Sequence, residues 1–212
     1  TVAEDGALTA SDTLTITDVD TSDNPISYND VAANLGSNGF GNFAMTGNTW
    51  TFTLNNAHAT VQALDSGESL TDSFTFTASD GSSQTVTVTI NGAEDAPTVT
   101  NAIADRIAIQ DVAFSFTFAV NTFTDIDASD VLTYTATLAD DSALPVWLGF
   151  DAATRTFSGT PAVADLGIIS VKVTADDGTS TVFDTFDITV KPANEIPVIG
   201  GDQTGSVTED ID

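Results

Sequence analysis

The residues best suited to do chemistry in this sequence are two groups of three aspartates with the same internal spacing. Asp18, Asp20 and Asp23 form the first group, and Asp125, Asp127 and Asp130 form the second. Three carboxylates within six residues repel one another unless a cation neutralises them. Because carboxylate oxygens are the hard ligands that Ca²⁺ takes in proteins, the spacing predicts two calcium-binding loops.

Strand-like segments must position both loops, since the first follows Thr13–Thr17 and the second follows Phe116–Thr124. Elsewhere threonines alternate with apolar residues, as in Ser73–Ala78 and Thr85–Ile90, which predicts half-buried antiparallel strands. Turn signals such as Asp80-Gly81 separate the strands, and no segment keeps a helical apolar period. The fold class that we expect is all-β, with antiparallel β-sandwiches in series.

Internal repeats set the module boundaries. Thr77–Gly81 matches Thr174–Gly178, and the proline-marked linker Asn91–Pro97 has its counterpart in Lys191–Pro197. We therefore expect one β-sandwich in residues 1–95, a second in 96–195, and a linker with the first strand of a further module in 196–212. A third repeat supports this division through its three copies: Glu4-Asp5, Gln110-Asp111 and Glu209-Asp210. With Thr1 in place of Met, the chain is expected to be a segment of a longer tandem array.

Charge and composition exclude several functions. The 31 acidic residues against 4 basic ones give a net charge of -27, which opposes binding to nucleic acid or to an anionic membrane. No apolar run reaches the roughly 18 residues of a membrane span. With no Cys and a single His58 without a nucleophile motif nearby, we expect no enzyme. Carboxylates at strand ends, rather than in an apolar cleft, also argue against glycoside hydrolysis.

Several residues have two open interpretations. Asp80, Asp177 and the pair Asp140-Asp141 fit either a metal site or a simple turn in which the side chain bonds the local backbone. Trp147, like Trp50, is expected in the core because apolar residues flank it, with a sugar-stacking role as the alternative. His58 is expected in a surface loop.

The first module resembles a VCBS-type repeat of large bacterial surface proteins. Its matching segments are Thr13–Asp20, Trp50–Leu54, Val61–Leu64, Gly67–Phe74 and Thr85–Pro97. The second module is similar to a dystroglycan-type cadherin-like domain, through Asn121–Tyr134, Ala143–Phe150, Thr156–Pro161 and Asp184–Val190. The resemblance implies two tandem Ig/cadherin-like sandwiches from the extender region of a type I-secreted, RTX-type adhesin, and an extracellular address on the bacterial cell surface.

The same resemblance implies that Ca²⁺ ions lie at the junctions between modules. The implied ligands of the internal junction are Glu4, Asp5, Asp80, Asn91, Glu94, Asp95, Asp125 and Asp127, with Asp176 completing the set and Asp130 on a neighbouring ion. This is more than one ion needs, so two or three ions are expected.

The outer junctions are incomplete in this sequence. Asp111, Asn194 and Glu195 would serve the following junction, and Asp18, Asp20 and Asp23 would serve the preceding one. Gln110 and Asn194 replace carboxylates, so the internal junction is expected to bind Ca²⁺ more tightly. The expected partners are neighbouring modules of the same monomeric chain, and the alternative function is a carbohydrate-binding module that attaches to polysaccharide.

Overall fold

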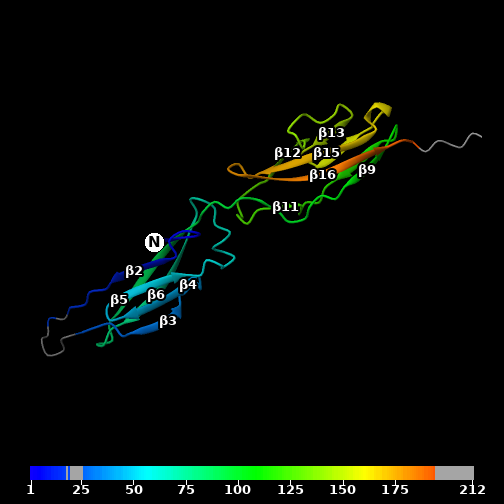
Figure 1. Cartoon of the computed structure of the whole chain (residues 1–212). Helices are drawn as coiled ribbons and strands as arrows, with labels where there is room; N and C mark the ends of the chain where they lie inside the picture. Colours follow the sequence, from blue (N-terminus) through cyan, green and yellow to red (C-terminus); the bar gives the residue numbers. More distant parts are fainter. Residues whose placement is uncertain (18, 20–25, 194–212) are drawn as a thin grey trace, which may run out of the picture. The chain divides into compact units, whose positions relative to one another are not determined.

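The computed structural model describes residues 1–17, 19 and 26–193, and these residues form an all-β fold, as expected (Figure 1). The predicted ligands Asp18, Asp20, Asp23, Asn194 and Glu195 lie outside the described residues, as does the segment 196–212. Contacts divide the chain into two compact units. Unit 1 consists of Thr1–Ala102, Ala119–Thr135 and Val173–Asp184, and unit 2 of Ile103–Phe118, Ala136–Lys172 and the chain from Thr185 onward.

Two sheets enclose the core of the first module. One has the order β1-β7-β6, formed by Val2–Ala3, Ser83–Asn91 and Ser69–Thr77. The other has the order β2-β5-β4-β3, formed by Thr9–Thr13, Thr49–Leu54, Gly41–Thr46 and Val31–Leu35. Phe43, Phe52 and Phe76 are fully buried between them, and Trp50 packs against this core from a half-buried position. The alternation of β6 and β7 buries their apolar side chains and exposes most of their threonines.

The second module has the same layered design. One sheet has the order β12-β15-β16-β9, formed by Thr133–Leu138, Gly167–Asp176, Thr181–Lys191 and Arg106–Ile109. A second has the order β10-β14-β13, formed by Phe114–Thr117, Thr156–Gly159 and Leu148–Asp151. β11 (Phe123–Thr124) pairs with β8 (Thr98–Val99), and the one helix among the described residues is the 3₁₀ turn η1 (Val163–Asp165). Phe157 is fully buried and packs edge-to-face against Phe186.

β1 and β9 each pair in parallel with the last long strand of their module. Val2 and Ala3 of β1 lie beside Ile90 and Asn91 of β7, and β9 pairs in parallel with β16. The Glu4-Asp5 and Gln110-Asp111 repeats follow these strands directly. Asp5 and Asp111 also share a positive φ, of 49° and 59°. The repeat therefore marks equivalent backbone positions in both modules.

The predicted strand Thr13–Thr17 is wrong in its position. The observed strand β2 ends at Thr13, where its partner β5 begins at Thr49 after the Gly47-Asn48 turn. Beyond this point Leu14 still donates its N–H to the Asn48 carbonyl, but β5 offers no further residue for Ile16 to pair with. The strand ends because its neighbour turns away.

Candidate metal centre

The segment after β1 brings two acidic side chains to the end of the first module. Glu4 donates its backbone N–H to the Asn91 carbonyl at 3.0 Å, which continues the parallel pairing by one residue. Its side chain is buried, with 2% exposed, and its Oε1 accepts a 2.7 Å hydrogen bond from Nε2 of Gln62. Asp5 is exposed and exchanges two hydrogen bonds with the side chain of Asn56.

The linker after β7 passes close to a second loop of the same module. Gly92 donates its N–H to the Glu68 carbonyl at 3.1 Å, and a Cβ on Gly92 would overlap the carbonyl oxygens of Leu64 and Asp65. Only glycine allows this approach. It places Glu94 beside Asp65.

The second aspartate loop follows β11 and completes the centre. Oδ2 of Asp127 accepts a 2.8 Å hydrogen bond from the Asp95 N–H, and Oδ1 of Asp125 accepts one of 3.1 Å from the Asp127 N–H. Ser129 donates its hydroxyl to Oδ2 of Asp65 at 3.1 Å. The loop, the linker and the Asp65 loop thus meet within unit 1.

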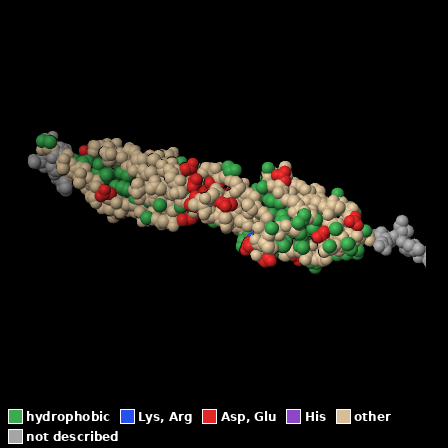
Figure 2. Space-filling model, turned by 90° about the horizontal axis from the view of Figure 1, so that it is seen from above, with side chains coloured by type: hydrophobic (Ala, Val, Ile, Leu, Met, Phe, Trp, Pro, Cys, Tyr) green, Lys and Arg blue, Asp and Glu red, His purple; other side chains and the backbone are tan. Residues whose placement is uncertain are grey.

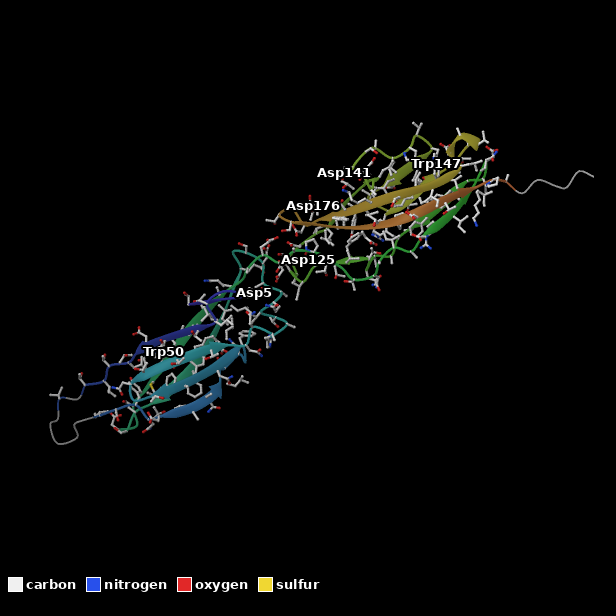
Figure 3. All side chains as sticks on the ribbon, in the orientation of Figure 1. Asp5, Trp50, Asp125, Asp141, Trp147 and Asp176 are labelled. Carbon is white, nitrogen blue, oxygen red and sulfur yellow. The ribbon has the colours of Figure 1, made fainter. Side chains whose placement is uncertain are left out.

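Three overlapping carboxylate triads result, each with its ligand atoms within 4.8 Å of one another. They are Asp65, Glu94 and Asp127; Glu94, Asp130 and Asp177; and Asp125, Asp127 and Asp130. We call the full set, with the adjoining Glu4, Asp5 and Asp95, the acidic cluster. Figure 3 shows Asp5 and Asp125, which come from segments far apart in the sequence.

Many oxygens of the acidic cluster are buried without a hydrogen-bond partner. They belong to seven carboxylates: Glu4, Glu94, Asp95, Asp125, Asp127, Asp130 and Asp177. Glu4 and Asp127 are the most deeply buried, with 2% and 3% exposed. A buried, unpartnered carboxylate oxygen has a large desolvation cost, so such a concentration of them favours the binding of a cation.

The electrostatics of the cluster agree with its geometry. Burial raises the pKa of Glu4 to about 7, and the charges of Asp95, Asp5 and Asp127 act in the same direction. Burial also raises the pKa values of Asp95, Asp127 and Asp130, each with help from neighbouring aspartates. For Glu94, a hydrogen bond with Thr179 lowers the pKa, but burial and the nearby Asp65 and Asp177 outweigh it. The described part of the protein does not offset the charges of these five carboxylates, whereas the N–H groups of Ser180 and Thr179 donate to Asp177 and lower its pKa.

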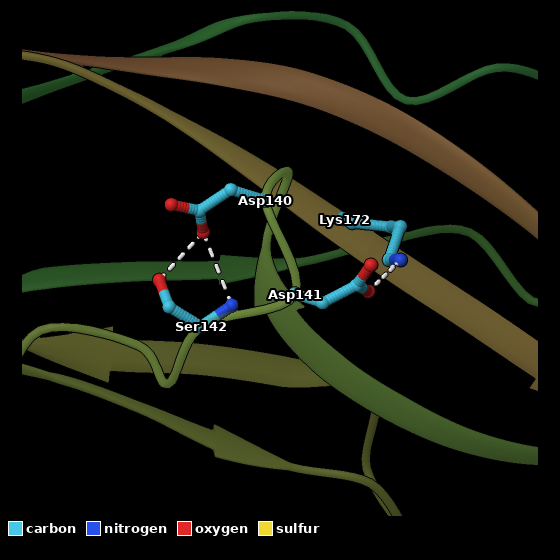
Figure 4. Close-up of polar contacts among 4 residues, drawn as sticks. All are labelled: Asp140, Asp141, Ser142 and Lys172. Carbon is cyan, nitrogen blue, oxygen red and sulfur yellow. Dashed lines mark hydrogen bonds and ion pairs between the residues drawn. The ribbon is translucent and has the colours of Figure 1, made fainter.

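A turn of unit 2 provides the contrast (Figure 4). Oδ1 of Asp140 accepts hydrogen bonds from the N–H and the hydroxyl of Ser142, at 3.0 and 2.6 Å, and these bonds lower the pKa of Asp140. Asp141 forms an ion pair with Lys172. These two aspartates therefore form a turn, which settles one of the open interpretations.

Such internal counter-charges are missing from the first module. Residues 1–105 contain no Lys or Arg, because the four basic residues are Arg106, Arg155, Lys172 and Lys191. Figure 2 shows Asp and Glu side chains gathered on one part of the surface, with scarcely any Lys or Arg visible in that view. A divalent cation fits a donor set composed of carboxylates, which are hard oxygen ligands.

The structure brings together seven of the predicted ligands: Glu4, Asp5, Glu94, Asp95, Asp125, Asp127 and Asp130. Asn91 contributes through its backbone carbonyl, while its side chain is exposed. Asp176 lies nearby but accepts the Gly178 N–H at 2.7 Å, and its neighbour Asp177 enters a triad instead. Asp111 lies elsewhere, in unit 2, where it accepts a hydrogen bond from Gln110.

The assignment of Asp80 to this centre is wrong. Asp80 lies in the turn between β6 and β7, whereas the linker leaves β7 at Asn91, nine paired residues away at the opposite end of the hairpin. Its Oδ1 accepts hydrogen bonds from Ser82, which lower its pKa. The second strand of a hairpin runs away from the turn, so the chain leaves that strand at the opposite end of the hairpin.

Two members of the cluster were missed as ligands of this centre, Asp65 and Asp177. Asp177 could have been found, because it aligns with Asp80 in the repeat and belongs to the module that follows the junction. Asp65 follows the Val61–Leu64 segment and has no counterpart in any repeat. Its role becomes visible only when the Gly92 contact is known.

Comparisons with known proteins agree with this architecture. Residues 1–92 match the family model described as "Bacterial Ig domain", and residues 96–191 match the one described as "Putative Ig domain". Domains 3–6 of protocadherin gamma B2 are similar at 16% identity and a TM-score of 0.50, over 91% of this chain and 49% of that one. Domains 1–5 are similar at 14% identity and a TM-score of 0.51, over 80% and 34%. The chain consists of Ig/cadherin-like repeats.

Other comparisons add little to this assignment. An endo-fucoidan hydrolase of glycoside hydrolase family 107 matches at 20% identity with a TM-score of only 0.41, over 82% of this chain. The repeats span 24% of that chain and less than half of the protocadherin chains. No curated protein matches. Bacterial Ig-like domains indicate a cell-surface extender or adhesion-type module. Within residues 1–17, 19 and 26–193, no helix is long and apolar enough to cross a membrane.

Proposed function

We propose that this chain is a calcium-binding extender segment of a bacterial cell-surface adhesin. Ca²⁺ in the acidic cluster would tie the linker and loops of residues 1–95 to the aspartate loop of residues 96–195. It would thereby stiffen the junction, so that the array projects distal binding domains away from the cell. The observation that carries this proposal is the set of seven carboxylates that each have a buried oxygen without a partner, drawn from both segments.

More than one ion fits the cluster. Its charges fall into two groups that share Asp125 and Asp127, with Glu4, Asp5 and Asp95 on one side and Asp65, Glu94, Asp130 and Asp177 on the other. A single Ca²⁺ takes six to eight oxygens. A pair or trio of ions that share Asp127 would neutralise both groups.

The finer identity of the modules belongs to the same proposal. We infer a VCBS-type repeat in residues 1–95 and a dystroglycan-type cadherin-like domain in 96–195, in an extracellular, monomeric array whose partners are its own neighbouring modules. The acidic side chains gather with one another rather than in an apolar cleft, which supports a structural role without catalysis.

Small-angle scattering on the 212-residue chain, in Ca²⁺ and in EDTA, tests the proposal. We expect EDTA to broaden the range of conformations and change the scattering profile while the sheets remain folded by circular dichroism. Calorimetry on Asp127→Asn should show at least one ion bound roughly tenfold more weakly, because the shared ligand loses its charge. Asp140→Asn, in the self-contained turn, is the control. An unchanged profile and maximum dimension in EDTA would refute the proposal.

A second candidate is attachment to polysaccharide, favoured by the surroundings of Trp147. This half-buried ring packs edge-on against Phe114 and lines a pocket of about 220 Å³ with Asp165 and Leu166. An aromatic wall beside a carboxylate suits a sugar ring. Binding on a glycan array that Trp147→Ala abolishes would support this function, and the absence of any bound glycan would remove it.

A further inference from the structure

Two amide side chains from one loop hold the two carboxylates that follow β1. Nε2 of Gln62 donates to Oε1 of Glu4 at 2.7 Å, and Nδ2 of Asn56 donates to Oδ1 of Asp5 at 2.6 Å. Asn56 also accepts the Asp5 N–H at 3.2 Å. Both amides lie in the loop between β5 and β6, which also carries Asp65 of the acidic cluster.

This loop is fixed by its own backbone. Val61 and Gln62 both donate their N–H groups to the His58 carbonyl, at 2.8 and 3.0 Å, and Leu64 donates to the Val61 carbonyl at 3.2 Å. Val61 is fully buried in the core of the first module. The Gln62 amide is therefore presented from a rigid support.

The hydrogen bond from Gln62 makes the two carboxylate oxygens of Glu4 different from each other. Oε1 is engaged by the amide, whereas Oε2 is buried and has no hydrogen-bond partner. The charges that act on Glu4 are those of Asp95, Asp5 and Asp127. The free oxygen is thus held on a side chain that is buried among the other members of the acidic cluster.

A neutral donor suits this task better than a charged one. An ammonium or guanidinium beside Glu4 would neutralise the carboxylate and compete with a metal ion, whereas an amide fixes its direction and leaves its charge in place. Both donors used here are amides, in a stretch of 105 residues without Lys or Arg.

We propose that Gln62 is a positioning residue of the calcium centre, which turns one oxygen of the buried Glu4 toward the ions, and that Asn56 positions Asp5 in the same way. The inference rests on the proposed calcium function. It identifies two amide side chains that are not themselves ligands as determinants of ion affinity.

The decisive variant is Gln62→Met, which keeps the length of the side chain but removes its donor. On the 212-residue chain, calorimetry with Ca²⁺ should show at least one ion bound 10- to 100-fold more weakly, as for other groups that orient metal ligands. Luminescence decay of bound Tb³⁺ in H₂O and D₂O counts coordinated waters, and Gln62→Met should add about one as Glu4 leaves the ion. Asn56→Ala should change both readouts in the same direction.

Gln84→Ala is the matched control, because Gln84 is an exposed glutamine of β7 whose Nε2 donates to the Thr85 carbonyl at 3.1 Å, away from the acidic cluster. If the original chain binds no Ca²⁺, the calcium function itself fails. If that chain binds Ca²⁺ and Gln62→Met retains both its affinity and its water count, the positioning role fails alone. A loss of stability in Gln62→Met without a change in hydration would likewise assign Gln62 to packing.

Discussion

At the scale of single residues, the first module contains buried carboxylates of two kinds. Asp72 is fully buried, yet its oxygens accept hydrogen bonds from the N–H groups of Asn38, Phe40, Gly41 and Ser73, at 2.8 to 3.2 Å. Glu4 is almost as deeply buried but keeps one oxygen without a partner. Burial alone therefore does not mark a ligand. The unsatisfied oxygen does.

Asp72→Asn should destabilise the fold without affecting ion binding. The variant places an amide nitrogen against backbone N–H donors, so we expect a loss of about 2 kcal/mol in the free energy of unfolding. Urea denaturation measures it, and calorimetry should show unchanged Ca²⁺ affinity. Asp12→Asn, on the exposed strand β2, is the control and should leave both quantities unchanged. Equal stability of the two variants would contradict this account of Asp72.

The raised pKa of Glu4 predicts how the metal-free protein responds to pH. In the folded chain this pKa is about 7, against 4.5 ordinarily, so the folded state holds its proton more strongly than the unfolded state. The free energy of unfolding should therefore fall as pH rises from about 4.5 to 7, and be highest, for this group, below that range. Urea denaturation in EDTA across this range measures the slope. Glu4→Gln should flatten it, and an equal slope in both proteins would show that another group is responsible.

At the scale of elements, the alternation of apolar and polar residues predicted strands that have one face toward the core. It did not predict where strands end or in which direction they pair, because neighbouring strands determine both. β6 and β7 were predictable because apolar residues and threonines alternate between the two faces of a long hairpin. The end of β2 depends on the turn of β5, and the parallel pairing of β1 depends on residues 88 positions later, as Val2 lies beside Ile90. The aspartate loop was predictable from its spacing, but the side of the junction to which Asp80 belongs depends on the direction of the hairpin.

Gly92→Ala should weaken ion binding from a distance. Its Cβ would collide with the carbonyl oxygens of Leu64 and Asp65, so the linker must move away and carry Glu94 and Asp95 with it. We expect Ca²⁺ affinity to fall by roughly tenfold or more, since misplaced ligands are costly at a metal site. Gly149→Ala, where a Cβ meets only the Ser158 carbonyl at 3.6 Å, is the control. Calorimetry on both variants tests this prediction. Equal affinities would show that the linker accommodates a Cβ at position 92 without displacing Glu94 and Asp95.

At the scale of the whole molecule, the distribution of charge decides what can stabilise the array. The chain has a net charge of -27, and its first 105 residues have no basic side chain to offset their acids. Self-repulsion of this kind weakens the folded state. Monovalent salt screens exposed charges but reaches the buried carboxylates of the acidic cluster poorly.

Ca²⁺ should therefore stabilise the chain far more than screening by a monovalent salt of the same ionic strength does. At a hundredfold excess over the dissociation constant, one ion adds about 2.7 kcal/mol to the free energy of unfolding, and several ions add more. Thermal unfolding in EDTA, in 5 to 10 mM CaCl₂, in equal MgCl₂ and in NaCl of matched ionic strength compares these effects. We expect the order Ca²⁺, then Mg²⁺, then Na⁺, because Mg²⁺ demands a smaller octahedral shell than overlapping carboxylate triads provide. Equal melting temperatures in the four buffers would mean that general screening, rather than bound ions, relieves the charge.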